Sequence, residues 1–366
     1  MIPSTGPPFA MTRWVAQTHQ NYVSVTPYNW TATRIHGFQA TRQPAIWMGE
    51  SGPVVVIPGV SRDGEAKVEA RFDERGLRMR KETEVITPSY YSVVLEDGFG
   101  GEVLVEQSSS EYYLSVSLHN ITILTFLQAS RVGHLRFTFT PSNSETDIPY
   151  ILLESSRPSI LTSTPTNISF PDGTTVIHPF PNTNHHVHEI CGSNSERQDS
   201  IITPTSTQPH VDNFRGYYCA RFDYDRPAQD HNLSLYGIVQ NTSSHPGIYV
   251  GRGALLSGYV LFPLEGERTT TVTVRIGTSF ISIDQARNNI DAEIPDRGPR
   301  AEDTRHSPQT LERTARLTRS AWVEKLDRFA LEGATEMQRE VFWTGVAHAL
   351  QVTLLLCPGL DFRLGG

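Results

Sequence analysis

Short segments with the two-residue periodicity of β-strands recur between turn signals from residue 1 to about residue 280, and no helical period separates them. Strand connections without helices are typical of antiparallel sheets, not of βαβ units. The pattern therefore predicts a mainly β fold, a large antiparallel super-sandwich. Clear strand-like segments are 54–57, 67–72, 90–95, 134–139, 150–153 and 270–276. Between them, 158–210 is rich in Ser, Thr, Pro, Asn and His and is predicted to form long loops.

The hydrophobic period changes to that of a helix near residue 283. A short helix is predicted over 284–290, and a longer amphipathic helix over 308–330 carries Leu311, Ala315, Trp322, Leu326 and Phe329 on one face. Ser307 and Pro308 are suited to begin that helix as N-cap and first helical residue.

A last helix is predicted over 335–356, where Thr335 and Gln338 have the spacing of a capping box. Its apolar side holds Val341, Phe342, Val346, Ala349 and Val352. The sequence therefore divides into a β-sandwich domain, 1–280, and a helical segment, 281–366.

The charge balance excludes some partners. The chain has a formal net charge of -8, and its 31 Lys and Arg residues are scattered among 39 acidic residues. Binding to the phosphates of nucleic acid requires clustered positive charge, so no nucleic-acid partner is expected. No apolar run approaches the length of a transmembrane helix, and no membrane partner is expected either.

Cysteines and sequons leave the compartment open. Cys191, Cys219 and Cys357 form no CxxC pair, which argues against a structural zinc site. Cys191 and Cys219 either pair in an exported protein or remain as two buried thiols. Sequons that would suit a secreted protein occur at Asn29, Asn120, Asn167, Asn232 and Asn241. The first residues lack a signal-peptide pattern, so both a secreted and a cytosolic location remain open.

Long motifs occur in a fixed order along the chain. Residues 7–14 lead into 22–28, and then into Ile35-His36-Gly37-Phe38-Gln39-Ala40-Thr41-Arg42-Gln43-Pro44-Ala45-Ile46-Trp47-Met48-Gly49-Glu50. Further motifs follow at 130–137, 189–197, 217–222, 277–282, 291–295 and 340–345. Together they resemble fungal members of glycoside hydrolase family 92 over about residues 1–350.

The resemblance implies a galactose-mutarotase-like sandwich followed by a six-hairpin helical barrel. Family members are calcium-dependent exo-α-mannosidases that invert stereochemistry and act on N-glycan mannose. Their sugar pocket lies at the domain interface, and the barrel supplies most catalytic groups and calcium ligands. Residues after 350 do not resemble the family's continuation. We therefore expect a chain truncated before its main packing partner, without catalytic residues or metal ligands and inactive alone. Whether it is an enzyme stays open, because a non-catalytic glycan-binding module is the alternative.

The resemblance places a sugar-contacting loop near the interface. Trp47, Gln43 and Trp14 are the leading candidates, because sugar C–H faces stack on indole and an amide bridges neighbouring hydroxyls. Glu50 is a further hydrogen-bonding candidate, and Arg42 stands where the family has histidine. An arginine cannot accept a proton or a metal as a neutral imidazole does. The alternative for Trp47 is a core position, since it lies in an apolar run.

Other candidates for chemistry have simpler explanations. An inverting glycosidase needs two carboxyl groups roughly 6.5–9.5 Å apart. Asp223 and Asp225 are close in sequence, but a solvated strand face or a loop brace explains them better. The histidine-rich run 185–189 is better explained as a solvated loop than as a metal site. His36 and His134 are expected to brace strands.

Overall fold

The fold is described from a computed structural model of the 366-residue chain. The structure describes residues 4–20, 27–41, 52–62, 67–111, 114–118, 121–125, 130–140, 142, 147–160, 168–178, 188–195, 215–224, 236–262, 269–295 and 310–351.

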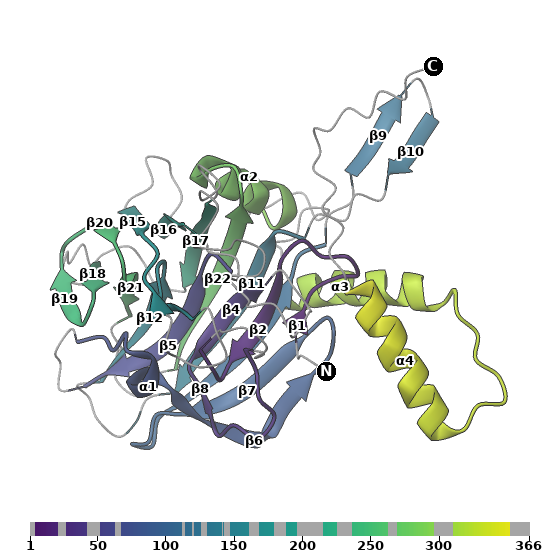
Figure 1. The fold of residues 1–366 in the computed structure, drawn as a ribbon, viewed down its shortest axis with the longest axis horizontal. Helices are drawn as coiled ribbons and strands as arrows, with labels where there is room; N and C mark the ends of the chain where they lie inside the picture. Colours follow the sequence, from purple (N-terminus) through teal and green to yellow (C-terminus); the bar gives the residue numbers. More distant parts are fainter. Residues whose placement is uncertain are drawn as a thin grey trace.

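Two large antiparallel sheets form the body of the molecule (Figure 1). The first has eight strands in the order β1-β2-β4-β5-β12-β21-β18-β19. The second has ten, in the order β20-β15-β16-β17-β22-β11-β8-β7-β6-β3. Strand and helix assignments thus confirm the predicted mainly β fold, with helices confined to short elements.

The eight-stranded sheet comprises β1 (Ser4–Thr5), β2 (Arg13–Gln17), β4 (Gly37–Thr41), β5 (Val55–Ser61), β12 (Ile148–Glu154), β18 (Tyr236–Gln240), β19 (Ser243–Pro246) and β21 (Leu256–Leu261). The ten-stranded sheet comprises β3 (Arg34–Ile35), β6 (Leu77–Ile86), β7 (Tyr91–Glu96), β8 (Glu102–Ser109), β11 (Val132–Thr140), β15 (Gly173–His178), β16 (His188–Asn194), β17 (Gly216–Tyr224), β20 (Val250–Gly253) and β22 (Thr270–Ser279). Two small hairpins pair β9 (Leu114–Leu118) with β10 (Ile121–Thr125) and β13 (Ser159–Ile160) with β14 (Ile168–Ser169).

The main core lies between the two sheets. Alternate residues of each strand point into it, as the period of two requires. Phe38 of β4 packs against Phe137 of β11, with ring centroids 6.1 Å apart. Leu135, Phe137, Val272 and Val274 belong to the same buried cluster and come from the neighbouring strands β11 and β22.

A second buried cluster covers the outer face of the eight-stranded sheet. It joins Ile57, Tyr150, Leu152 and Tyr259 to Val68, which lies outside the strands. The prediction of a strand over 67–72 is therefore wrong. Residues 67–71 cross the sheet without regular structure, and the short helix α1 (Phe72–Arg75) begins at Phe72. Among the described residues, the segment 67–71 pairs with no strand, and the burial of Val68 explains its strand-like pattern.

Helices follow the last strand of the ten-stranded sheet, as the change in period predicted, and two of them cover the outer face of that sheet. Helix α2 (Ile283–Glu293) packs on β22 and β17, and α3 (Leu311–Leu326) packs on β8 and β11. Helix α4 (Glu336–Leu350) extends from the body and buries no residue of its own (Figure 1). Its capping box of Thr335 and Gln338 is present as predicted. Among the described helices, none has the length and apolarity that a membrane span requires.

Two sequence-based expectations are corrected here. The stretch 158–210 is not made only of long loops, because it contributes β15 and β16 to the ten-stranded sheet. Its many Ser, Thr and His residues hid these strands. Helix α3 begins at Leu311 with Thr310 as its N-cap, so Ser307 is not the cap. Pro308 lies outside the described residues.

Of the two alternatives for Cys191 and Cys219, a disulfide or two buried thiols, the structure contains the disulfide. Cys191 of β16 and Cys219 of β17 face each other across the ladder and form a disulfide. Both are fully buried, in a cluster with Ala286 and Ile290 of α2. Cys357 lies outside the described residues.

Candidate functional site

The predicted sugar-contacting segment leaves the eight-stranded sheet after Thr41 and returns at Gly52. Its base is closed: an added Cβ at Gly52 would lie 1.7 Å from the Ala40 carbonyl oxygen, and Ala40 N donates to Val54 O at 3.2 Å. Asn194 Nδ2 donates to the neighbouring Pro53 O at 3.1 Å. Only glycine permits this close approach at position 52.

A buried arginine stands beside this base. Arg13 is paired with Thr41 across β2 and β4, and it is 1% exposed. Its guanidinium donates to the carbonyls of Pro7 at 2.9 Å and Gly6 at 3.4 Å. Burial lowers the pKa of Arg13 to about 9. The N-terminal residues therefore wrap around a positive charge that supports the base of segment 42–51.

The same carbonyl connects this base to helix α3. Gly6 O also accepts a hydrogen bond from Trp322 Nε1 at 2.8 Å. Thr318, one turn earlier, donates to Ser109 O at 2.5 Å, and both helix residues are buried. These contacts link β2, the strand paired with the end of β4, to helix α3.

The predicted sugar-contact residues fall into two groups. Arg42, Gln43, Trp47 and Glu50 lie outside the described residues. Trp14 is fully buried, and a Cβ on Gly133 of β11 would lie 2.2 Å from its ring. In this structure the indole of Trp14 belongs to the core and has no surface that a sugar could contact.

A buried carboxyl that the sequence analysis did not single out lies near this junction. Glu293, at the end of α2, is 5% exposed, and its Oε2 accepts from Ser110 Oγ at 2.5 Å and Arg131 N at 2.9 Å. Burial raises the pKa of Glu293 to about 7, against these two donors and the charge of Arg131. Its place in the motif 291–295 was the available signal. Both donors hold the same oxygen, so the side chain braces α2 against β11.

We expect Glu293→Gln to remove a pH dependence of stability. A folded pKa raised from 4.5 to about 7 means that the stability which Glu293 contributes is present below pH 4.5 and lost as the pH rises to 7. The difference amounts to roughly 3 kcal/mol. An amide oxygen can keep both donors, so E293Q should flatten the profile of unfolding free energy against pH. Denaturant titrations between pH 4 and 8 measure this, with exposed Glu332→Gln as the control. A slope unchanged in E293Q would contradict the assignment.

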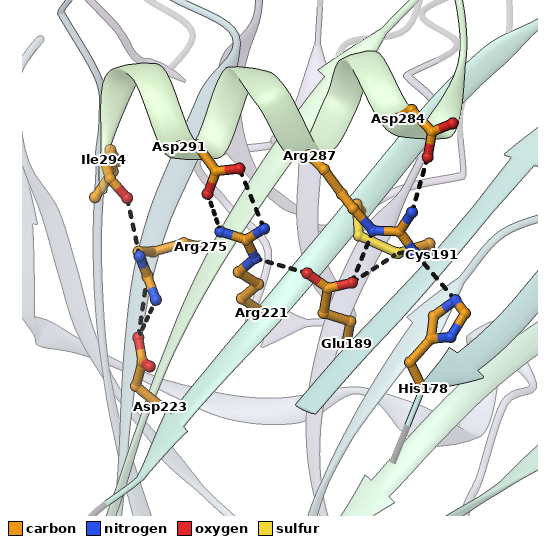
Figure 2. Close-up of polar contacts among 11 residues, drawn as sticks. His178, Glu189, Cys191, Arg221, Asp223, Arg275, Asp284, Arg287, Asp291 and Ile294 are labelled. Atoms are coloured by element: carbon orange, nitrogen blue, oxygen red, sulfur yellow. Dashed lines mark hydrogen bonds and ion pairs between the residues drawn. A yellow bond between two sulfur atoms is a disulfide. The ribbon is translucent and has the colours of Figure 1, made fainter. Parts of the chain in front are cut away.

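Acidic groups under α2 form a bracing network (Figure 2). Glu189 of β16 accepts from Arg221 Nε at 2.7 Å and from Arg287 Nε at 2.8 Å. Arg221 also pairs with Asp291, and Arg287 pairs with Asp284 at 2.9 Å. Burial opposes ionisation of Glu189, but the two guanidinium groups outweigh it and lower its pKa. A carboxylate held ionised in this way cannot serve as a general acid at neutral pH.

Of the acid pair Asp223 and Asp225, the described residue, Asp223, also takes part in a bracing contact. Asp223 accepts from Arg275 Nε at 3.0 Å, and Arg275 Nη1 donates to Ile294 O at 2.9 Å. Asp225 lies outside the described residues, as do His185 and His186. The two histidines expected to brace strands instead contact helices: His36 Nδ1 lies 2.7 Å from Phe72 O of α1, and His134 Nδ1 lies 2.9 Å from Thr314 Oγ1 of α3.

Within the described ranges, one group of potential metal ligands comes together: Glu189, Cys191 and Cys219. It does not fit calcium, which takes oxygen ligands. Both sulfurs are joined in the disulfide, and the carboxylate already pairs with Arg221 and Arg287. No calcium chemistry is assigned to these residues.

Comparison with known proteins identifies the sandwich. The model of the glycosyl hydrolase family 92 N-terminal domain matches residues 1–279. An uncharacterized secreted glycosidase of Arthroderma benhamiae is 27% identical over 148 residues, which are 38% of this chain and 17% of the relative.

Solved structures share the fold. An inverting mannosidase of family GH92 from Bacteroides thetaiotaomicron VPI-5482 aligns with a TM-score of 0.64 at 19% identity, covering 96% of this chain and 36% of its own. A GH92 alpha-mannosidase of the same species aligns with a TM-score of 0.61 at 17% identity, covering 96% and 39%. The chain therefore spans well under half of the proteins it resembles.

Proposed function

This chain belongs to glycoside hydrolase family 92 through its N-terminal domain, and on that basis we propose that it is the β-sandwich part of a calcium-dependent exo-α-mannosidase that acts on N-glycan mannose. The observation that supports the proposal best is the family match over residues 1–279. Thr41, the last described residue before segment 42–51, is paired with Arg13, which shares the Gly6 carbonyl with Trp322 of α3.

In this proposal the sandwich binds and orients the sugar. Trp47 stacks on the C–H face of a mannose ring, while Gln43 and Glu50 hydrogen-bond its hydroxyls. Arg42 can donate hydrogen bonds there but cannot take the proton-accepting part of a histidine. A helical barrel packed on the sandwich would supply the general acid, the general base and the calcium ligands. No catalytic step is therefore assigned to residues of this chain.

We expect the purified chain not to hydrolyse 4-nitrophenyl α-D-mannopyranoside, with or without calcium. Inversion requires a protonated carboxyl and an ionised one on opposite sides of the sugar. The described candidates, Glu189 and Glu293, are held by bracing contacts. Release of 4-nitrophenol is the measurement. Calcium-dependent turnover that persists after repurification and is lost in Glu50→Gln would show that the catalytic groups lie in this chain.

A further inference from the structure

A cavity of about 200 Å³ opens on the outer face of the eight-stranded sheet, where α1 meets the ends of β2, β12 and β21 and the β18–β19 turn. Ligand sites for drug-sized molecules are roughly 300–1,000 Å³, so this cavity fits one small ring. It is remote from the predicted interface: α1 and β19 lie on the opposite side of the molecule from α4 (Figure 1).

A buried ion pair forms the wall of the cavity. Arg75 donates to Glu154 through both Nη atoms, at 2.8 and 3.3 Å, and its side chain is 1% exposed. Nη2 also donates to Gln17 Oε1 at 3.1 Å. The remaining donor, Nε, is buried and has no acceptor among the described residues. The ion pair therefore gives the cavity a fixed polar wall without net charge.

An aromatic ring stands next to this pair. Phe72 is half-buried, and its ring is stacked on His36 with centroids 4.2 Å apart. His36 Nδ1 also lies 2.7 Å from the Phe72 carbonyl oxygen, and this contact holds the imidazole against the phenyl ring. Side-chain amides and hydroxyls complete the lining, among them Gln17, Gln20, Asn241 and Thr242. A rigid apolar ring beside many donors and acceptors suits a molecule with a C–H face and several hydroxyls.

The local charges favour a neutral ligand. Glu154 neutralises Arg75, and Glu69 neutralises Arg71 through contacts of 2.9 and 3.1 Å. An anion in the cavity would meet the Glu154 carboxylate as well as Arg75, so repulsion offsets attraction. Arg157 adds one more cation to the lining, which makes an anionic ligand the competing outcome.

We propose that this cavity binds a single neutral monosaccharide ring, at a site separate from segment 42–51. Phe72 packs against the sugar's C–H face, and the side-chain amides of Gln20 and Asn241 bond its hydroxyls. The assignment goes beyond the proposed function and does not rest on it.

Calorimetric titration of the full chain tests the site, with methyl α-D-mannopyranoside, methyl α-D-glucopyranoside and N-acetylglucosamine as probes. Each titration is repeated in Trp47→Ala, so that binding at segment 42–51 does not contribute. We expect a roughly millimolar dissociation constant for at least one sugar, weakened about tenfold by Phe72→Ala and by Gln20→Ala. The second change removes one amide of the lining and leaves the Arg75–Glu154 pair intact.

The matched control is Phe170→Ala, an exposed aromatic residue that does not line the cavity, and thermal melts of each variant without ligand verify folding. Absence of saturable sugar binding in Trp47→Ala would overturn the proposal. Affinity unchanged in both cavity variants would do the same. Saturable binding of inorganic phosphate or glucuronate, with none of the neutral sugars bound, would replace a neutral ligand by an anionic one.

Discussion

Replacing Trp322 by alanine is expected to lower the free energy of unfolding by about 3–5 kcal/mol. The indole is 4% exposed, and its Nε1 donates to Gly6 O at 2.8 Å across the junction between α3 and the N-terminal residues. Truncation leaves a cavity and removes a buried donor. Since Arg13 depends on the same carbonyl, loosening of 6–13 is part of the expected cost.

The control is the adjacent residue of the same helix. Val323 is 46% exposed, so Val323→Ala should change the unfolding free energy by no more than about 0.5 kcal/mol. Urea denaturation followed by circular dichroism measures both variants. Equal, small effects in the two variants would mean that α3 is not an integral part of the sandwich.

Ending the chain after Gly333 is expected to give a monomer that melts like the sandwich of the full chain, whereas the full chain associates. Helix α4 buries no residue, and it exposes Met337 by 74% and Val341 by 69%. Exposed apolar patches drive association. Its one described backbone bond to the body, from Phe9 N to Leu350 O, is worth about 1 kcal/mol.

A shorter chain ending after Pro295 provides the contrast, because it also loses α3. That helix buries Leu311, Thr318 and Trp322 against the sandwich, so the shorter chain should melt far lower or fail to fold. Light scattering after size exclusion and thermal melts compare the three lengths. If the chain ending after Gly333 melts as low as the one ending after Pro295, α4 is part of the folded body.

The sequence predicted the strands whose faces alternate most regularly. β11 and β22 were located because Leu135, Phe137, Val272 and Val274 recur every second residue, and the core selects that period. β15 and β16 were missed because buried polar residues such as Thr175 and Ser193 interrupt the pattern. For 67–72, burial of Val68 by a crossing segment imitated a strand.

Helix α3 shows the same limit. The predicted face included Leu311 and Trp322, which are buried, but also Phe329, which is 42% exposed. The positions that complete the buried face are Thr314 and Thr318, whose hydroxyls bond His134 and the Ser109 carbonyl. Partners so distant in sequence cannot be read from a local pattern. The sugar candidates came from family resemblance, because periodicity carries no information about a ligand.

The most direct test of this account is calorimetric titration of α-1,2-linked mannobiose into the full chain, Trp47→Ala and Trp30→Ala. Trp30 is the matched control, an indole 64% exposed with Lys81 Nζ 3.6 Å from its ring centroid. If segment 42–51 contacts mannose, Trp47→Ala weakens binding by roughly tenfold, the equivalent of about 1.4 kcal/mol, and Trp30→Ala leaves it unchanged. Wild-type affinity in Trp47→Ala would contradict the proposed role of the sandwich in binding mannose.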